Sequence, residues 1–199
     1  MKKIVTGVLC AAALTLQVEA NSVEHNFIID IMPGSMQVHE DTEGFYNTNG
    51  VDKEEITGVA SFSPNISAGY GLDIPFGSFD VTGGIGAMIN GAFSAVYTQV
   101  ELAGYVTTRK KGFMIGPFVR YVNIADPEWA TDNLEMKGTT ALAYGIGMMT
   151  GGKKVKFKMK ISSLNGADIA VNGLNGYNES QSSISLDGIG IELGIALRF

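Results

Sequence analysis

Cysteine is nearly absent from this chain: Cys10 is the only one among 199 residues. A single cysteine excludes an internal disulfide, and the two histidines offer no zinc site of the usual spacing. The sequence also lacks a Gly-Lys-Ser/Thr phosphate motif, a helical heptad repeat, and an apolar run of the roughly 20 residues that a membrane-spanning helix needs. We therefore expect no cofactor, no bound metal and no stabilisation by disulfides.

The N-terminus has the pattern of a secretory signal peptide. Lys2 and Lys3 precede a short apolar run over residues 4–16, and small residues follow it near a cleavage site. The run is too short to span a membrane. We expect residues 1–20 to be cleaved as a signal peptide, and residues 21–199 to form one domain.

The chain is acidic, with 14 basic and 20 acidic residues and a net charge of −6. Loss of Lys2, Lys3 and Glu19 with the signal peptide leaves 12 basic and 19 acidic residues, a net charge of −7. Because an acidic protein repels the phosphate backbone, we expect no nucleic-acid partner.

Polar and apolar residues alternate along much of the chain, which predicts β-strands. The clearest case is V-K-F-K-M-K-I at 155–161, where three lysines form one face and four apolar residues form the other. No helix is needed between the strands. We expect eight of them, at 23–33, 57–75, 79–90, 95–107, 112–123, 139–149, 154–162 and 185–199.

The connections between these strands differ in length. We expect tight turns at 75–78, 108–111 and 150–153, and long connections at 34–56, 124–138 and 163–184. Barrels of the bacterial outer membrane have short periplasmic turns and longer extracellular loops. The sequence therefore predicts an all-β fold, an eight-stranded antiparallel up-and-down transmembrane β-barrel.

The two faces of the predicted strands differ in kind. One face carries no Asp, Glu, Lys or Arg, whereas the other carries every charge within the strands and many of the glycines. A soluble, lipocalin-like barrel has the same alternation, but its apolar face points inward and its polar face points to water. The lumen of an eight-stranded barrel is narrow, so long Lys and Arg side chains need small neighbours and charged partners there. This favours charges inside and the apolar face against lipid.

Several of the inward charges are predicted to lie at mid-height in the barrel. We expect them to form a network that plugs the lumen, with Lys156 nearer the barrel mouth. The other members of this network are Lys158, Lys160, Arg120, Glu101 and Glu192.

The last strand alternates strictly up to a terminal aromatic residue. Its apolar positions are Leu193, Ile195, Leu197 and Phe199. This end resembles the C-terminal signal by which the barrel assembly machinery recognises outer-membrane proteins. With the signal peptide and eight strands, the chain resembles the small outer-membrane barrels: the OmpX/Ail and opacity-protein group and the OmpA membrane domain. The resemblance implies the outer membrane of a Gram-negative bacterium, with its lipid and lipopolysaccharide as neighbours.

Function in that family lies in the loops and varies from member to member. Here the long connections are acidic, and we expect a structural or surface-interaction role through them, with an extracellular ligand as partner. Carboxylate clusters also suit Ca²⁺ or Mg²⁺, but no EF-hand spacing is present. The acidic residues are Glu40, Asp41, Glu43, Asp52, Glu54, Glu55, Asp126, Glu128, Asp132 and Glu135.

Two other functions remain open. One is a narrow pore for small solutes, although the lumen of an eight-stranded barrel is usually filled. The other is an enzyme that modifies lipid A, which needs a serine, a histidine base and an orienting carboxylate. We expect His25 near the periplasmic interface and His39 in a loop without a suitably spaced serine. We therefore expect no enzymatic activity.

Overall fold

The structure is a computed structural model, and it describes most of the chain after the predicted signal peptide. That peptide, residues 1–20, lies outside the described part. The described residues are 23–39, 45–46, 53–54, 60–90, 93–108, 112–129, 134–174 and 182–199.

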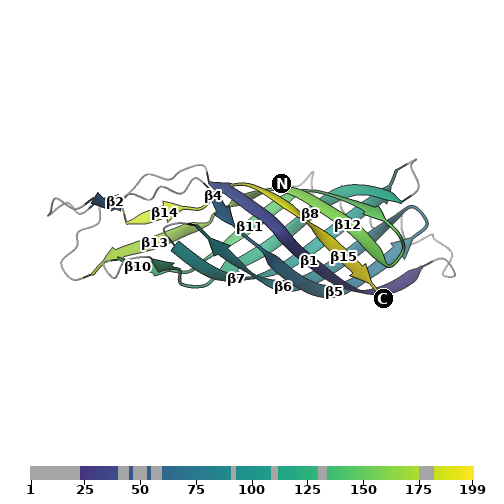
Figure 1. Ribbon diagram of the computed structural model, residues 1–199, viewed down its shortest axis with the longest axis horizontal. Helices are drawn as coiled ribbons and strands as arrows, with labels where there is room; N and C mark the ends of the chain where they lie inside the picture. Colours follow the sequence, from purple (N-terminus) through teal and green to yellow (C-terminus); the bar gives the residue numbers. More distant parts are fainter. Residues whose placement is uncertain are drawn as a thin grey trace, which may run out of the picture.

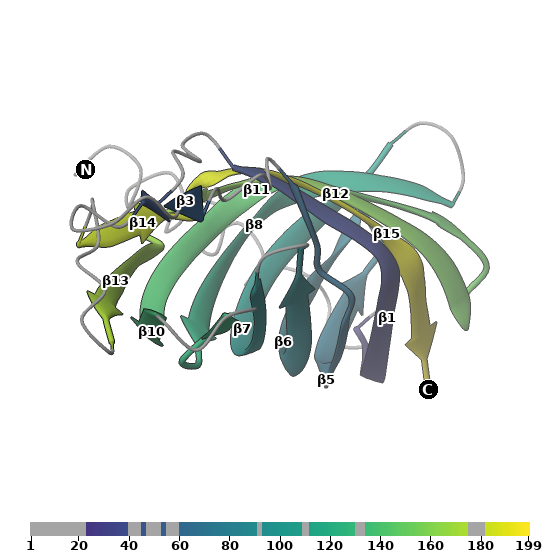
Figure 2. The ribbon, with the colours of Figure 1, turned by 60° about the vertical axis from the view of Figure 1, so that its left-hand side comes forward.

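Eight antiparallel strands form a closed ring. Each strand pairs with the next along the chain, and the last, β15, pairs with the first, β1. The strands run obliquely along the long axis of the molecule (Figure 1) and curve round together (Figure 2). The prediction of an all-β fold with eight antiparallel strands is confirmed. The ring strands are β1 (Glu24–His39), β5 (Asn65–Ile74), β6 (Gly77–Ile89), β7 (Phe93–Thr107), β8 (Phe113–Ile124), β11 (Thr139–Gly151), β12 (Val155–Asn165) and β15 (Gly188–Arg198).

Shorter strands, other than β4, lie in connections that were predicted to be loops. Three of them form a separate antiparallel sheet in the order β10-β13-β14, which lies at the left-hand end of Figure 1. We call this end the loop end, and the opposite end, where the tight connections lie, the turn end. The short strands are β2 (Phe45–Tyr46), β3 (Lys53–Glu54), β4 (Ala60–Phe62), β9 (Glu128–Trp129), β10 (Leu134–Lys137), β13 (Asp168–Gly173) and β14 (Ser183–Ser185).

The first strand is longer than the sequence predicted. It was expected to stop at Pro33, but β1 continues to His39 because a bulge between Ile31 and Gly34 accommodates Pro33. Proline cannot donate to a ladder of hydrogen bonds, and a bulge needs no such donor. The buried side chains are at even positions up to Met32 and at odd positions from Ser35 onward. The extra residue thus shifts the inward-facing phase by one position.

The second predicted strand, 57–75, is divided in two. Ser63 and Pro64 separate β4 from β5, and both strands pair with β1, on either side of its bulge. The backbone groups at the break remain bonded: Ser63 N–H donates to Ser35 O at 2.8 Å, and the Pro64 carbonyl accepts from Ala87 N–H at 3.1 Å. The strand is therefore interrupted at Ser63 and Pro64, but backbone hydrogen bonds to the neighbouring strands continue across the break.

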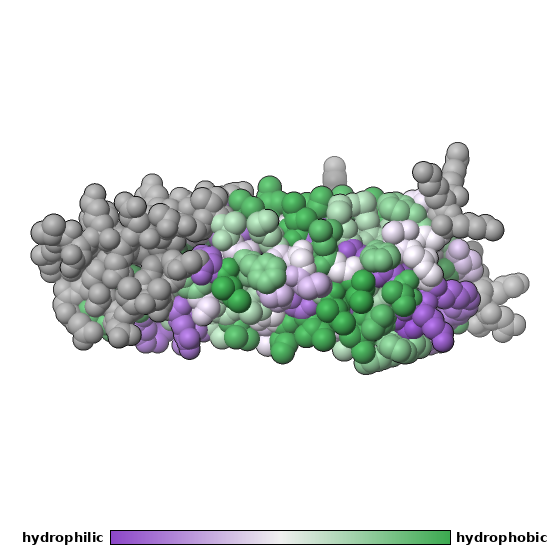
Figure 3. Space-filling model, viewed as in Figure 1, coloured by the Kyte–Doolittle hydropathy of each residue, from purple (hydrophilic) through white to green (hydrophobic). Residues whose placement is uncertain are grey.

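The ring strands bury one face and expose the other. On β12, the lysines at 156, 158 and 160 are buried, whereas Phe157 is 66 % exposed and Lys158 only 2 %. Exposed apolar side chains of this kind occur on all eight ring strands. Figure 3 shows hydrophobic residues over the middle of one face of the molecule, with hydrophilic residues toward its ends. The ring is therefore apolar outside and charged inside.

No helix in the described residues is long and apolar enough to cross a membrane.

Candidate functional site

Among the described residues, ten charged side chains from seven strands lie in the interior of the ring. Their Cβ atoms point inward because successive side chains of a strand alternate between its two faces. Five are acids and five are bases, so the group is electrically balanced. The members are Asp30, Asp73, Asp80, Glu101 and Glu192, with Arg120, Lys156, Lys158, Lys160 and Arg198.

The central cluster consists of Arg120, Glu101, Glu192 and Lys160. These residues come from two cross-strand pairs, Glu101 with Arg120 and Lys160 with Glu192. Arg120 Nη1 lies 2.6 Å from Glu192 Oε1, and Arg120 Nη2 lies 2.7 Å from Glu101 Oε2. Lys160 Nζ contacts the other oxygen of Glu101 at 2.7 Å. Glu101 is thus shared by two cations.

The turn-end cluster consists of Arg198, Asp73, Asp80, Lys158 and Asp30. Arg198 bonds Asp73 through Nη1 and Asp80 through Nη2, each at 2.6 Å. Lys158 Nζ lies 2.6 Å from Asp30 Oδ2 and 3.8 Å from Asp80 Oδ2, which links the two halves of the cluster. Removal of one partner from a buried ion pair is strongly destabilising, because it leaves an uncompensated charge in the interior.

The predicted network residues are divided between these clusters. Four of them, Arg120, Lys160, Glu101 and Glu192, form the central cluster. Lys158 was expected in one network with Glu192, but the strand register sets it opposite Gly194, and its close partner is Asp30. The pairing of Lys158 with Asp30 could not be deduced from the sequence, because it depends on how β1 and β12 are staggered around the ring.

Lys156 differs from the other interior lysines. It is buried, and among the described residues it has no ion pair within 4 Å. Its position on β12 is the closest of the three lysines to the turn end, opposite Ala196 of β15. Glu24 also departs from the expectation that it faces the interior: its side chain is exposed at the turn end, 3.0 Å from Lys153 Nζ.

Aromatic rings line part of the charged interior. The Phe118 ring centroid lies 5.4 Å from Arg120 Cζ and 5.3 Å from Lys160 Nζ, and the Tyr105 centroid lies 5.7 Å from Lys158 Nζ. Cations attract the faces of aromatic rings at this range, and the attraction grows when water is excluded. Neither ring was predicted to lie in the lumen.

Glycine makes room for the interior side chains at some positions and for the neighbouring backbone at others. A Cβ on Gly71 would lie 3.1 Å from Arg198 Nη1 and 2.5 Å from Ile28 Cδ1, so a larger residue would displace the cluster. A Cβ on Gly145 would lie 1.9 Å from the carbonyl oxygen of Ile161 on the adjacent strand. Close approach of strands, as well as long charged side chains, therefore explains the glycine-rich inner face.

Toward the loop end the interior becomes apolar. Ring residues such as Tyr97, Val122 and Leu164 pack with residues of β10, β13 and β14 in one buried cluster. We call the part contributed by the short strands the apolar cap. The alternating D-I-A-V-N-G of β13 is the sequence signal for it, although this stretch was predicted to be part of a loop. The cap comprises Leu134, Met136, Ile169, Val171, Ile184 and Leu186.

His39 joins the cap to the ring. It was expected in a loop, but it ends β1 and is only 3 % exposed. In the neutral ring, Nδ1–H donates to the Leu186 carbonyl at 2.9 Å, so Nε2 accepts from the Ser61 hydroxyl at 2.7 Å. Ser61 is fully buried. His25 is exposed near the turn end, and its Nδ1 contacts the Tyr70 hydroxyl.

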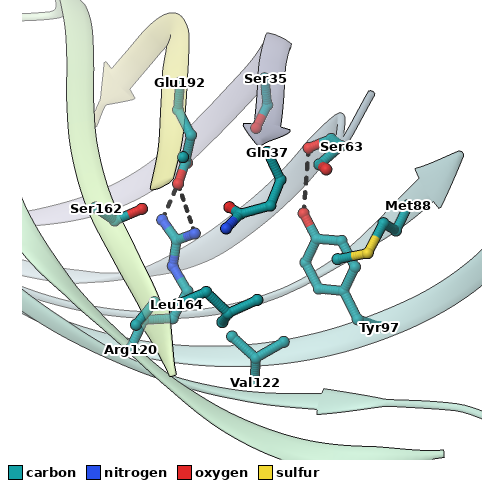
Figure 4. A pocket seen from close by; sticks show the side chains of 12 residues that line it. Ser35, Gln37, Ser63, Met88, Tyr97, Arg120, Val122, Ser162, Leu164 and Glu192 are labelled. Atoms are coloured by element: carbon teal, nitrogen blue, oxygen red, sulfur yellow. Dashed lines mark hydrogen bonds and ion pairs between the residues drawn. The ribbon is translucent and has the colours of Figure 1, made fainter. Parts of the chain in front are cut away.

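A small cavity lies beside the central cluster (Figure 4). Arg120 and Glu192 lie along one side of it, and Tyr97, whose hydroxyl donates to the Ser63 carbonyl at 3.2 Å, lies on another. Met88, Val122 and Leu164 complete the apolar walls. The cavity is therefore polar where it meets the central cluster and apolar where Met88, Val122 and Leu164 line it.

The described residues contain no group of three or more His, Cys, Asp or Glu side chains that could hold a metal ion. Several acidic residues of the predicted loops, among them Glu40, Asp41, Glu43, Asp52 and Asp132, lie outside the described part of the chain. Asp126 accepts a hydrogen bond from Gly138 N–H at 2.6 Å, which fixes the start of β11.

Comparison with known proteins found no family model that matches this chain and no curated protein of similar sequence.

Proposed function

We propose that this chain is an integral outer-membrane β-barrel of a Gram-negative bacterium. Its lumen is plugged by charge, and its role is structural or one of surface interaction through acidic extracellular loops. The observation that carries the proposal is the inversion of the usual globular arrangement: charges are buried inside the ring and large apolar residues cover its outside. Soluble proteins rarely expose a large continuous apolar surface, whereas lipid requires one.

The closed hydrogen bonding of the ring supports the same proposal. A strand edge in a bilayer would leave backbone N–H and C=O groups without partners, at a cost of several kcal/mol each. Here β15 pairs with β1, and Phe199 exchanges two backbone hydrogen bonds of 3.0 Å with Phe27, so the wall closes up to the last residue. Such a barrel would have outer-membrane lipid and lipopolysaccharide as neighbours and would depend on the barrel assembly machinery for insertion.

The filled interior favours a plug over a pore. The turn-end and central clusters occupy successive heights of the ring, and the apolar cap lies above them. A narrow pore for small solutes is the second candidate, and the cavity beside Arg120 and Glu192 is the observation that favours it.

A lipid A-modifying enzyme has less support. Ser61 and His39 form a hydrogen-bonded pair, but the third partner is a backbone carbonyl and not a carboxylate. Neither residue lines the cavity, and both are enclosed. A catalytic serine must reach its substrate, so this pair suits a structural tie between strands better than catalysis.

Replacement of Phe157 by arginine tests the membrane proposal. Arginine on the lipid face of a barrel costs about 2–4 kcal/mol at the bilayer midplane. We expect Phe157→Arg to lower the free energy of unfolding in lipid vesicles by an amount of this order, with Phe157→Leu as the matched control. A soluble ring would tolerate arginine at this exposed position. Equal stability of both variants, or release of the wild type from membranes by carbonate without detergent, would refute membrane insertion.

The role of the loops is tested separately, in cells. Removal of the loop between β1 and β4 should leave the ring folded, since the ring strands on either side pair with their own neighbours. We expect this deletion to abolish adhesion or ligand binding at the cell surface while heat-modifiable barrel remains in the outer membrane. If surface binding and envelope integrity are unchanged after deletion of each long loop, the surface-interaction role is refuted and only a structural role remains.

A further inference from the structure

The cavity beside the central cluster contains a side chain whose bonding is incomplete. Gln37 of β1 is 8 % exposed, and its Nε2 has no hydrogen-bond partner among the described residues. Its amide points into the cavity in Figure 4, where Arg120 and Glu192 lie opposite. An amide nitrogen buried in this way loses its hydration without compensation unless something in the cavity accepts its hydrogen bonds.

The other polar groups around Gln37 are placed to complete a small network. Ser35, Ser63 and Ser162 also line the cavity, from β1, the β4–β5 link and β12. A Cβ on Gly190 would lie 2.6 Å from Gln37 Oε1 and 2.9 Å from Ser162 Oγ, so the absence of a side chain there preserves this polar corner. Donors and acceptors are both present, which matches a neutral ligand that can donate and accept.

The size of the cavity limits that ligand. The centre of a water molecule can occupy about 30 Å³ of the space. One ordered water needs roughly 10–15 Å³ by this measure, together with two to four polar partners. The cavity therefore has room for about two or three waters and is too small for an acyl chain or a sugar.

We propose that this cavity is a binding site for an ordered cluster of about two or three water molecules, which bridges Gln37 to the Arg120–Glu192 pair and Ser162. The cluster joins β1 above its bulge to the central cluster. No side-chain hydrogen bond among the described residues makes that connection directly. The inference concerns the interior alone and holds whether or not the ring resides in a membrane.

The direct test counts long-lived internal waters in the purified, folded protein. Oxygen-17 magnetic relaxation dispersion of the wild type and of Gln37→Leu should differ by about two or three waters. Met88→Leu is the matched control, since it changes another cavity-lining residue, removes no polar bond and should keep the wild-type count. An equal count in the wild type and Gln37→Leu, or a crystal structure of the wild type with a larger molecule in the cavity, would overturn the proposal.

A stability measurement separates a hydrated cavity from a dry one. If water satisfies the Gln37 amide, Gln37→Leu removes bonded partners, and the urea midpoint of unfolding should fall. If the cavity is dry, the same change removes an unpaired buried donor, and the midpoint should rise. A rise would therefore contradict the water site even if the relaxation experiment failed for technical reasons.

Discussion

At the scale of single residues, the interior behaves as a set of linked pairs with little redundancy. Glu192 holds Arg120 through Oε1 at 2.6 Å, and Glu101 holds both Arg120 and Lys160. Loss of Glu192 would leave two buried cations competing for one carboxylate. A buried charge that loses its partner destabilises a protein by about 3–5 kcal/mol.

We therefore expect Glu192→Ala to lower the free energy of unfolding by about 3–5 kcal/mol, measured by urea titration in lipid vesicles. Adding Lys160→Met should recover part of this loss, because it removes the cation that shares Glu101 with Arg120. Lys158→Met is the informative control. It restores the same net charge but leaves Asp30 without its lysine, so it should make Glu192→Ala worse. Equal rescue by both methionines would mean that net charge alone matters.

At the scale of strands, the bulge in β1 determines which side chains face inward. Ser35, Gln37 and His39 point into the ring only because the bulge between Ile31 and Gly34 supplies one extra residue. A one-residue slip in a strand moves every later side chain to the opposite face. The bulge therefore orients both Gln37, which lines the water site, and His39, which bonds the apolar cap.

Deletion of Pro33 should accordingly prevent folding, whereas Pro33→Ala should be tolerated because it keeps the residue count. The measurement is the fraction of heat-modifiable, folded protein recovered from membranes. Wild-type recovery of the deletion variant would show that β1 can re-register without the bulge.

The C-terminal strand carries a second prediction at this scale. Phe199 is 69 % exposed, and its backbone closes the ring against Phe27. If the terminal aromatic ring is read by the assembly machinery, Phe199→Asp should leave unfolded periplasmic protein, while Phe199→Tyr should assemble normally. The outer-membrane fraction would be compared by immunoblot in cells. Normal assembly of the aspartate variant would remove Phe199 from the recognition signal.

The strands themselves could be predicted from the sequence because alternation is a local property. V-K-F-K-M-K-I has one possible inward face once the narrow lumen is considered, and the three lysines are indeed buried. Pairing is different: whether Lys158 meets Glu192 or Asp30 depends on the stagger of strands distant in sequence. The apolar cap was missed for a related reason, since its short strands bury their side chains only against the ring and against each other.

At the scale of the whole molecule, the interior is layered along its axis. The turn-end cluster, the central cluster, the cavity and the apolar cap follow one another from the turn end to the loop end. Ions crossing such a column would have to break several buried ion pairs and then pass an apolar layer, and each step is costly in a low-dielectric interior.

We therefore expect no steady conductance from the purified protein in planar lipid bilayers. Porin preparations at the same protein-to-lipid ratio would serve as the positive control. Regular, ion-selective openings of the wild type that disappear on boiling would overturn the plug and favour the narrow pore.

The equal number of acids and bases in the interior also constrains how the protein can diverge over time. A substitution that removes one member of an ion pair leaves its partner buried and unpaired, so the chain passes through a less stable form before a second change restores the balance. Position 120 is expected to change together with 192, and 158 together with 30. The outward apolar positions have no such partners and can drift one at a time. In an alignment of related sequences, the two positions of each ion pair should then covary.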